Sequence, residues 1–364
     1  MPGTLPRILY QKNVALLLKV VIFSWFFNHL TILKLFVLSY QHSGLATRQA
    51  PTRTSMTYHY ILCASLLLLS QAASAERRVE EATITLQGEQ RQYFRLYDTE
   101  AVHSGPAILL ISGSGCADFG SRFPGFFEKY PAPLDAYFLE KPHVKKGDDG
   151  RACSDAFINA DYLERRVADN LEFLDTQPLL KKRGKHSIAV VGLSEGGAIA
   201  PLVASQSDKI GWLATAGSGG MQQSEELLYF ADHGVEPYAK PFSRPYFLKE
   251  YAAIKQDPGN LQKEFFGHRY RYWSSHLFRD PIAAYSKLNI PMVAAMGEND
   301  DSVPLESGKV LQRYFQAHPD KDFQFIVYPK AGHALQTPGN NGALSFIASL
   351  AKWFRGEAGA FSGL

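Results

Sequence analysis

Strand-like and helix-like segments alternate along most of this chain, and no other feature of the sequence restricts the fold as strongly. Runs of apolar and branched residues, typical of buried strands, occur at 106–115, 135–141, 188–191, 211–220, 291–300 and 323–333. An antiparallel strand pair is expected before them, at 82–86 and 91–98, and helices are expected at 160–176 and 343–354. This order predicts an α/β fold with a mostly parallel sheet flanked by helices.

One segment interrupts the alternation. Residues 222–285 contain no convincing strand but are rich in phenylalanine, tyrosine and tryptophan. The segment is too long for an ordinary connection, so we interpret it as a helical cap inserted over the sheet. Its aromatic residues suggest a small-molecule or peptide substrate with an apolar or aromatic group. The same residues would also serve as the core of the cap itself.

Composition argues against several classes of function. The chain is 46% hydrophobic and 20% charged, as in globular proteins that form a core. Residues 1–75 hold six Lys or Arg and no Asp or Glu, whereas the chain carries 38 bases and 35 acids, so its larger remainder is mildly acidic. An acidic body is not suited to nucleic acid. The sequence also lacks metal-ligand spacings and a dinucleotide-binding glycine motif, so we expect neither a metal nor a cofactor.

The N-terminal region is predicted to be separate from the folded body. A short apolar run at 61–76 ends in Ala73-Ser74-Ala75, which is typical of a secretory signal with a small-residue cleavage site. We therefore expect an upstream extension at 1–55, with synthesis starting at Met56, a signal peptide at 56–75 and a mature domain at 76–364. The mature protein would be periplasmic or secreted. The alternative is a membrane anchor at 14–40, a longer apolar stretch that Lys19 and Lys34 interrupt.

Export would change the interpretation of the cysteines. Cys63 would leave with the signal peptide, so that the mature chain keeps Cys116 and Cys153. Two thiols in an oxidising compartment predict one disulfide bond. Two unpaired, buried thiols are the alternative.

Ser194 is the candidate nucleophile. It lies in Gly192-Leu193-Ser194-Glu195-Gly196, directly after a buried-strand run and directly before a helix-like run. The Gly-x-Ser-x-Gly pattern alone is weak, but a nucleophile elbow requires this order of strand, sharp turn and helix. The helix N-terminus would also present free N–H groups to developing negative charge.

A serine nucleophile needs a base, and the base needs an acid that orients it. His333 follows a predicted late strand in a Gly-His step and is the preferred base. Asp300, at the exit of the strand predicted at 291–300, is the preferred acid, with Asp301 and then Glu298 as competitors. Taken alone, this acidic stretch would be interpreted as a solvated turn.

The oxyanion needs two backbone N–H donors. One is expected from Glu195, the residue after the nucleophile, and the other from the glycine-rich loop within 111–120, through Ser114 or Gly115. An ordinary glycine turn is the alternative interpretation of this loop.

The order of Ser194, Asp300 and His333, with a glycine-rich loop upstream, resembles the α/β-hydrolase superfamily. The resemblance covers about residues 80–356. Within the superfamily, the chain is similar to the dienelactone hydrolase-like and prolyl-oligopeptidase-like branches. It implies an α/β-hydrolase fold, with an eight-stranded, mostly parallel sheet and a cap inserted after the sixth strand. It also implies the catalytic roles assigned above. The loop here contains Ser112-Gly113-Ser114-Gly115, whereas many relatives have His-Gly.

These features predict an exported serine hydrolase that cleaves a carboxylic ester or thioester through an acyl-enzyme. A serine peptidase of the same fold is the alternative. A binding protein that kept the fold without catalysis is a second alternative, since a fold alone does not prove activity.

Overall fold

The computed structural model describes residues 76–99 and 105–363. The predicted extension at 1–55, the predicted signal peptide at 56–75 and the alternative anchor at 14–40 lie outside these residues. Of the helices in the described part, none combines the length and the apolar character needed to cross a bilayer.

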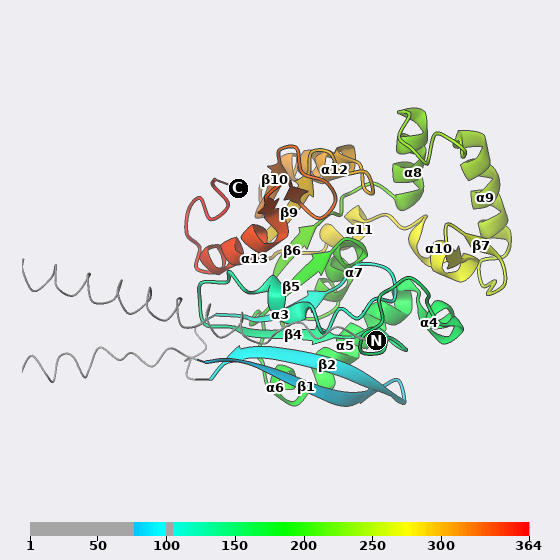
Figure 1. The fold of residues 1–364 in the computed structure, drawn as a ribbon. Helices are drawn as coiled ribbons and strands as arrows, with labels where there is room; N and C mark the ends of the chain where they lie inside the picture. Colours follow the sequence, from blue (N-terminus) through cyan, green and yellow to red (C-terminus); the bar gives the residue numbers. More distant parts are fainter. Residues whose placement is uncertain (1–75, 100–104, 364) are drawn as a thin grey trace, which may run out of the picture. The chain divides into compact units, whose positions relative to one another are not determined.

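Eight strands form the central sheet, in the spatial order β1-β2-β4-β3-β5-β6-β9-β10 (Figure 1). Their bounds are Arg77–Leu86 (β1), Glu89–Asp98 (β2), Ala107–Ile111 (β3), Asp135–Leu139 (β4), Ile188–Leu193 (β5), Ile210–Ala216 (β6), Met292–Gly297 (β9) and Phe323–Tyr328 (β10). Strand β2 is antiparallel to both of its neighbours, and all pairs from β4 to β10 are parallel. The predicted α/β class and mostly parallel sheet are confirmed.

Helices cover both faces of this sheet. Successive side chains of a strand point to opposite faces, so Leu109 packs into one apolar cluster and Leu110 into the other. On the face with Leu109 lie Leu163–Thr176 (α5), Pro178–Lys181 (α6), Glu195–Ala204 (α7), Ile282–Tyr285 (α11) and Leu305–Gln316 (α12). On the face with Leu110 lie Phe123–Phe126 (α3) and Gly342–Trp353 (α13). This burial on two faces explains why the parallel strands are almost continuously apolar.

The cap is the segment between β6 and β9. It contains Gln223–Asp232 (α8), Arg244–Gln256 (α9), Glu264–Phe265 (β7), His268–Arg269 (β8), Tyr270–His276 (α10) and the short helix α11. The β7–β8 pair was not expected, because strands of two residues are too short to show a periodic pattern. Three other short elements lie outside the cap: Asp155–Ala160 (α4), Gln336–Thr337 (β11) and Asn340–Asn341 (β12).

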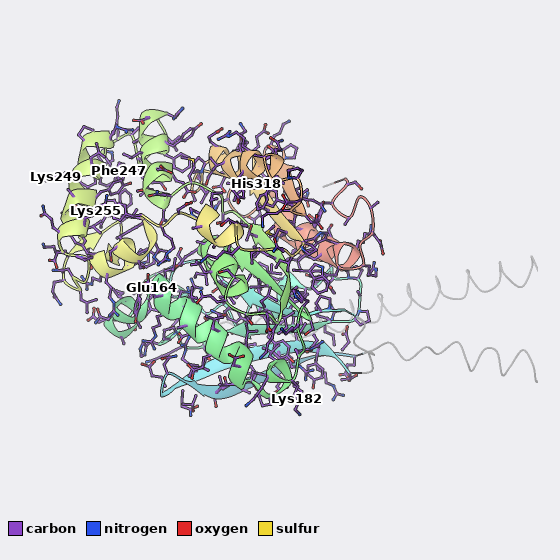
Figure 2. All side chains as sticks on the ribbon, turned by 180° about the vertical axis from the view of Figure 1, so that it is seen from behind. Glu164, Lys182, Phe247, Lys249, Lys255 and His318 are labelled. Atoms are coloured by element: carbon purple, nitrogen blue, oxygen red, sulfur yellow. A yellow bond between two sulfur atoms is a disulfide. The ribbon has the colours of Figure 1, made fainter. Side chains whose placement is uncertain are left out.

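The cap has an apolar core of its own. Phe247 on α9 is fully buried against other aromatic residues, whereas Lys249 and Lys255 of the same helix are exposed (Figure 2). Members of this cluster include Leu227, Tyr251, Ile254, Phe265 and Trp273. Most of the aromatic residues in the cap therefore stabilise the cap itself.

Candidate active site

Ser194 stands alone between strand β5 and helix α7. Its backbone has φ 55° and ψ −122°, a conformation that is unusual for a residue with a side chain. Two glycines permit this turn. A Cβ on Gly192 would overlap the carbonyl oxygen of Gly196, and a Cβ on Gly196 would overlap the carbonyl oxygen of Ile111. The close packing of strand and helix therefore requires both glycines and holds Ser194 at the tip of the turn.

The structure brings Ser194, His333 and Asp300 together. The Nε2 atom of His333 lies 2.7 Å from the Oγ atom of Ser194, and its Nδ1 atom lies 2.9 Å from Oδ2 of Asp300. The Asp300 side chain is fully buried, and its Oδ1 atom also accepts hydrogen bonds from the backbone N–H groups of Ser302 and Val303. These bonds fix the carboxylate so that it faces the imidazole.

The two competing acids do not contact His333. Asp301 is exposed, and its Oδ1 atom is 3.3 Å from the hydroxyl of Ser302. The carboxylate of Glu298, also exposed, accepts a hydrogen bond from the backbone of Lys330. Of the three acids that the sequence placed in this turn, Asp300 is therefore the one positioned to orient the base.

The glycine-rich loop after β3 runs beside Ser194. Ser114 lines the cavity in front of Ser194, whereas Gly115 is not among the lining residues. A Cβ on Gly113 would lie 3.1 Å from the Cβ of Ser194, so this glycine lets the loop approach the elbow closely. Glu195 begins helix α7, and N–H groups in the first turn of a helix have no partner within it.

Two buried cations, whose roles the sequence did not indicate, bind the backbone carbonyl groups of this loop. The Nζ atom of Lys141 donates to the carbonyl oxygens of Gly113, at 3.0 Å, and of Gly115. Arg166 on α5 donates to the carbonyl of Ser112 at 2.8 Å. Three carbonyl oxygens of the loop are therefore directed towards buried positive charge. Burial lowers the pKa of Lys141 to about 8.

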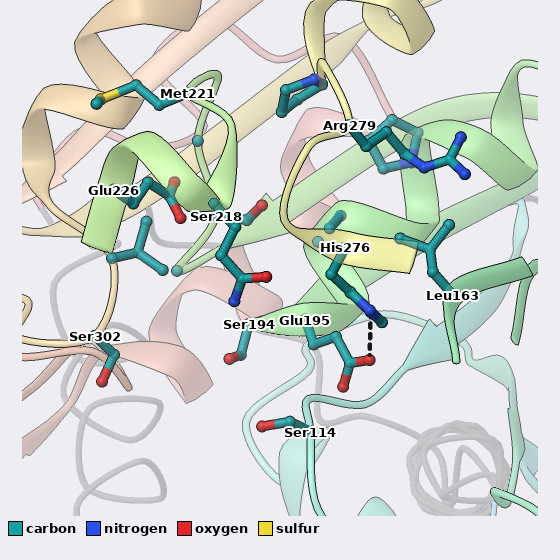
Figure 3. Close-up of a pocket in the computed structure, with 18 of the residues that line it drawn as sticks. Ser114, Leu163, Ser194, Glu195, Ser218, Met221, Glu226, His276, Arg279 and Ser302 are labelled. Atoms are coloured by element: carbon teal, nitrogen blue, oxygen red, sulfur yellow. Dashed lines mark hydrogen bonds and ion pairs between the residues drawn. The ribbon is translucent and has the colours of Figure 1, made fainter. Parts of the chain in front are cut away.

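The side chain of Glu195 connects the elbow to the cap. Its carboxylate lies 2.9 Å from Nη1 of Arg166 and 2.9 Å from Nε2 of His276, which belongs to cap helix α10 (Figure 3). Burial opposes the charged form, but Arg166 and His276 together hold the pKa of Glu195 well below its usual range. The first residue after the nucleophile is thus fixed by contacts to the core and to the cap.

A disulfide bond closes beside the glycine-rich loop. Cys116 and Cys153 are bonded, with 5.5 Å between their Cα atoms. Cys116 directly follows Gly115, and Cys153 precedes helix α4. The bond therefore ties the loop that borders Ser194 to a distant part of the chain.

A cavity of about 290 Å³ opens in front of Ser194 and His333. Tyr272 is the one Phe, Tyr or Trp among the described residues that line it. The wall combines small and apolar residues with polar and charged ones, the latter including Gln223, Glu226, His276, Arg279 and Asp280. Within 76–99 and 105–363, His, Cys, Asp and Glu do not gather in any group that could hold a metal ion.

A comparison with known protein families agrees with the fold. A family model described as alpha/beta hydrolase family matches residues 108–339. No curated protein sequence matches the chain.

Similar solved structures include Est1E from Butyrivibrio proteoclasticus, with 14% identity, a TM-score of 0.49, and 76% of this chain and 97% of that chain covered. The 2,6-dihydroxy-pseudo-oxynicotine hydrolase has 14% identity and a TM-score of 0.50, with 77% and 69% covered. The acylaminoacyl peptidase of Pyrococcus horikoshii has 13% identity and a TM-score of 0.47, with 80% and 43% covered. At such identities, the likeness concerns the fold alone.

Proposed function

The chain belongs to the alpha/beta hydrolase family, and we propose that it is an exported serine hydrolase that cleaves a carboxylic ester or thioester. The observation that carries this proposal is the continuous hydrogen-bonded series from Asp300 through His333 to Ser194. A nucleophile, a base and an acid in this geometry are what acyl transfer through a serine requires.

The proposed reaction begins when the Oγ atom of Ser194 attacks the substrate carbonyl carbon. His333 accepts the hydroxyl proton at Nε2, and Asp300 stabilises the imidazolium that forms. The same proton then passes to the departing alcohol or thiol, and the acyl group stays on Ser194. Water, deprotonated by His333, attacks the acyl-enzyme and releases the acid.

Negative charge develops on the carbonyl oxygen in both tetrahedral intermediates. In the proposed mechanism, the N–H of Glu195 and one N–H of the glycine-rich loop, from Ser114 or Gly115, stabilise this oxyanion. Lys141 and Arg166 support this role, because their hydrogen bonds to three carbonyl groups of the loop hold its backbone in place. The disulfide Cys116–Cys153 supports the proposal of an oxidising compartment.

The test combines a label with substrate turnover. The purified protein is treated with a fluorophosphonate probe and assayed with p-nitrophenyl esters of two to twelve carbons. We expect labelling and ester hydrolysis in the wild type, and neither in Ser194→Ala. The matched control is Ser205→Ala at the other end of helix α7, which should keep both.

Other outcomes would favour one of the two alternatives, a serine peptidase or a binding protein. Labelling at Ser194 without ester hydrolysis, together with cleavage of a peptide library, would replace the esterase by a peptidase. A folded protein that is neither labelled nor active would contradict the serine hydrolase and favour a binding protein.

A further inference from the structure

A buried carboxyl group in the cavity has no part in the proposed triad. Glu226, on the first cap helix α8, is 7% exposed and lines the same cavity as Ser194 and His333. Figure 3 shows its carboxyl group on the cap side of the cavity, across from Ser194. Glutamate is rarely buried to this extent without a cationic partner.

Hydrogen bonds satisfy only one of its two oxygens. Oε1 accepts a hydrogen bond from the hydroxyl of Ser307 at 2.6 Å, and that hydroxyl oxygen accepts from the backbone N–H of Met221. The hydroxyl of Ser307 has a single proton, which it uses for this bond. Among the described residues, none forms a hydrogen bond with Oε2 of Glu226. Oε2 can therefore accept a hydrogen bond from a molecule bound in the cavity.

The charges around Glu226 are negative. Burial is the main cause that raises the pKa of Glu226, and the negative charges of Asp300 and Glu225 raise it further. Burial raises the pKa of Tyr238 and of Tyr251 in the cap, and the charge of Glu226 adds to both shifts.

The other two acids that line the cavity, Glu195 and Asp280, differ from Glu226 in their surroundings. The carboxylate of Glu195 is paired with Arg166 and His276, and that of Asp280 accepts the backbone N–H of Ile282. The cation Arg279 at the cavity wall is paired with Glu164. Asp280 is exposed to solvent, so Glu226 is the buried acid of the cavity wall that lacks a cationic partner among the described residues.

We propose that Glu226 binds a protonated amine of the substrate, so that the enzyme prefers esters that carry an ammonium group near the scissile carbonyl. An ammonium ion donates to carboxylate oxygens and would supply the missing positive charge. This inference rests on the proposed function, since it names the class of ester that the same cavity accepts.

The first experiment compares esters of equal shape. The p-nitrophenyl esters of alanine and isobutyrate differ by an ammonium in place of a methyl group, as do those of β-alanine and butyrate. We expect the wild type to favour the amine member of at least one pair by tenfold or more in kcat/KM. In Glu226→Gln this preference should fall to less than threefold, because the amide keeps the shape and loses the charge.

Glu225→Gln is the matched control. Glu225 is the exposed neighbour on the same helix, and its variant should keep the full preference. A third ester, of lactate, has a hydroxyl group in place of the amine. Equal preference for lactate and alanine, retained in Glu226→Gln, would overturn recognition by charge.

A second measurement does not require an amine ester. Propylammonium should inhibit hydrolysis of p-nitrophenyl butyrate competitively in the wild type, 1-propanol should not, and Glu226→Gln should be insensitive to both. Inhibition should strengthen from pH 6 to pH 8, because binding of the cation expels the proton that Glu226 retains in the empty cavity.

The failures of the two proposals can be told apart. If the enzyme hydrolyses neutral esters through Ser194, without preferring amine esters and without being inhibited by propylammonium, the role proposed for Glu226 is wrong. The proposed serine hydrolase activity is unaffected in that case. If no ester is cleaved, the proposed function is wrong, and calorimetric titration with propylammonium still tests Glu226. Absence of heat in that titration would overturn the binding site. Thermal melting of Glu226→Gln establishes that the variant is folded.

Discussion

At the scale of single residues, the active site depends on backbone positions as much as on side chains. Ser194 can adopt its strained conformation because Gly192 and Gly196 leave room for the turn. Both glycines could be identified from the sequence, because the Gly-x-Ser-x-Gly motif directly follows a strand-like run and directly precedes a helix-like run. The roles of Lys141 and Arg166 could not, because their partners in the glycine-rich loop lie 28 and 54 residues away in sequence.

The two adjacent aspartates allow a sharp test of the triad. Asp300→Asn should lower kcat/KM for ester hydrolysis by about 10³–10⁴-fold, because the amide favours the wrong tautomer of His333. Asp301→Asn should stay within twofold of the wild type, because that side chain does not contact His333. Steady-state kinetics with one p-nitrophenyl ester measures both. Equal losses in the two variants would mean that Asp300 is not the orienting acid.

Lys141 is predicted to be a positioning residue for the oxyanion loop. Lys141→Met removes the donor to the carbonyls of Gly113 and Gly115, so the loop should lose its fixed orientation. We expect kcat to fall about 10- to 100-fold with little change in KM, somewhat less than for removal of an oxyanion donor itself. The exposed Lys145→Met is the control. A folded Lys141→Met variant with normal kcat would exclude this role.

Glu226 should make stability depend on pH. Burial raises its pKa to about 8 from an ordinary value of 4.5. The folded state therefore binds more protons than the unfolded state between these values, and stability should decrease as pH rises through this range. Glu226→Gln lacks this titration, so the Tm of the wild type relative to the variant should drop by several degrees from pH 5 to pH 8. Calorimetric melts at both pH values measure it, and a constant difference would contradict the raised pKa.

At the scale of secondary-structure elements, the strands of the sheet were predictable because each is short, apolar and followed by a turn. The predicted strands extend beyond the observed C-terminal ends, since β9 ends at Gly297 and β6 at Ala216. Asp300 therefore lies in the loop after β9. Hydrophobic runs do not mark the point where hydrogen bonding in the sheet stops. The β7–β8 pair gave no signal, because its four residues are too few for any period.

The disulfide bond between Cys116 and Cys153 links two loops that connect elements of the fold. It closes 37 residues, for which the chain-entropy model gives a stabilisation of about 3–4 kcal/mol. Reduction, or the double substitution Cys116→Ser with Cys153→Ser, should lower Tm. It should also lower kcat, because Cys116 adjoins Gly115. Melting and ester kinetics with and without dithiothreitol provide the measurement. If both Tm and kcat are unchanged, the bond has neither role.

At the scale of the whole molecule, the position of the cap could be predicted but its contacts could not. The gap in the strand pattern fell at 222–285, and in the structure this segment lies between β6 and β9. The aromatic composition of the segment suggested an aromatic substrate, whereas most of these side chains pack against one another. The contact between Glu195 and His276 spans 81 residues, so it depends on how the cap folds back over the sheet, which no local pattern encodes.

The last prediction concerns where the mature chain begins. Strand β1 starts at Arg77 and pairs along its full length with β2, and the carbonyl of Glu76 accepts a hydrogen bond from the N–H of Thr99. Cleavage after Ala75 would leave this edge of the sheet intact, whereas a cut within β1 would remove backbone hydrogen bonds. We therefore expect N-terminal sequencing of protein recovered from the exported fraction to give Glu76-Arg77-Arg78. An N-terminus upstream of Glu76 would contradict cleavage at this site, and activity found only in the membrane fraction would favour the anchor at 14–40.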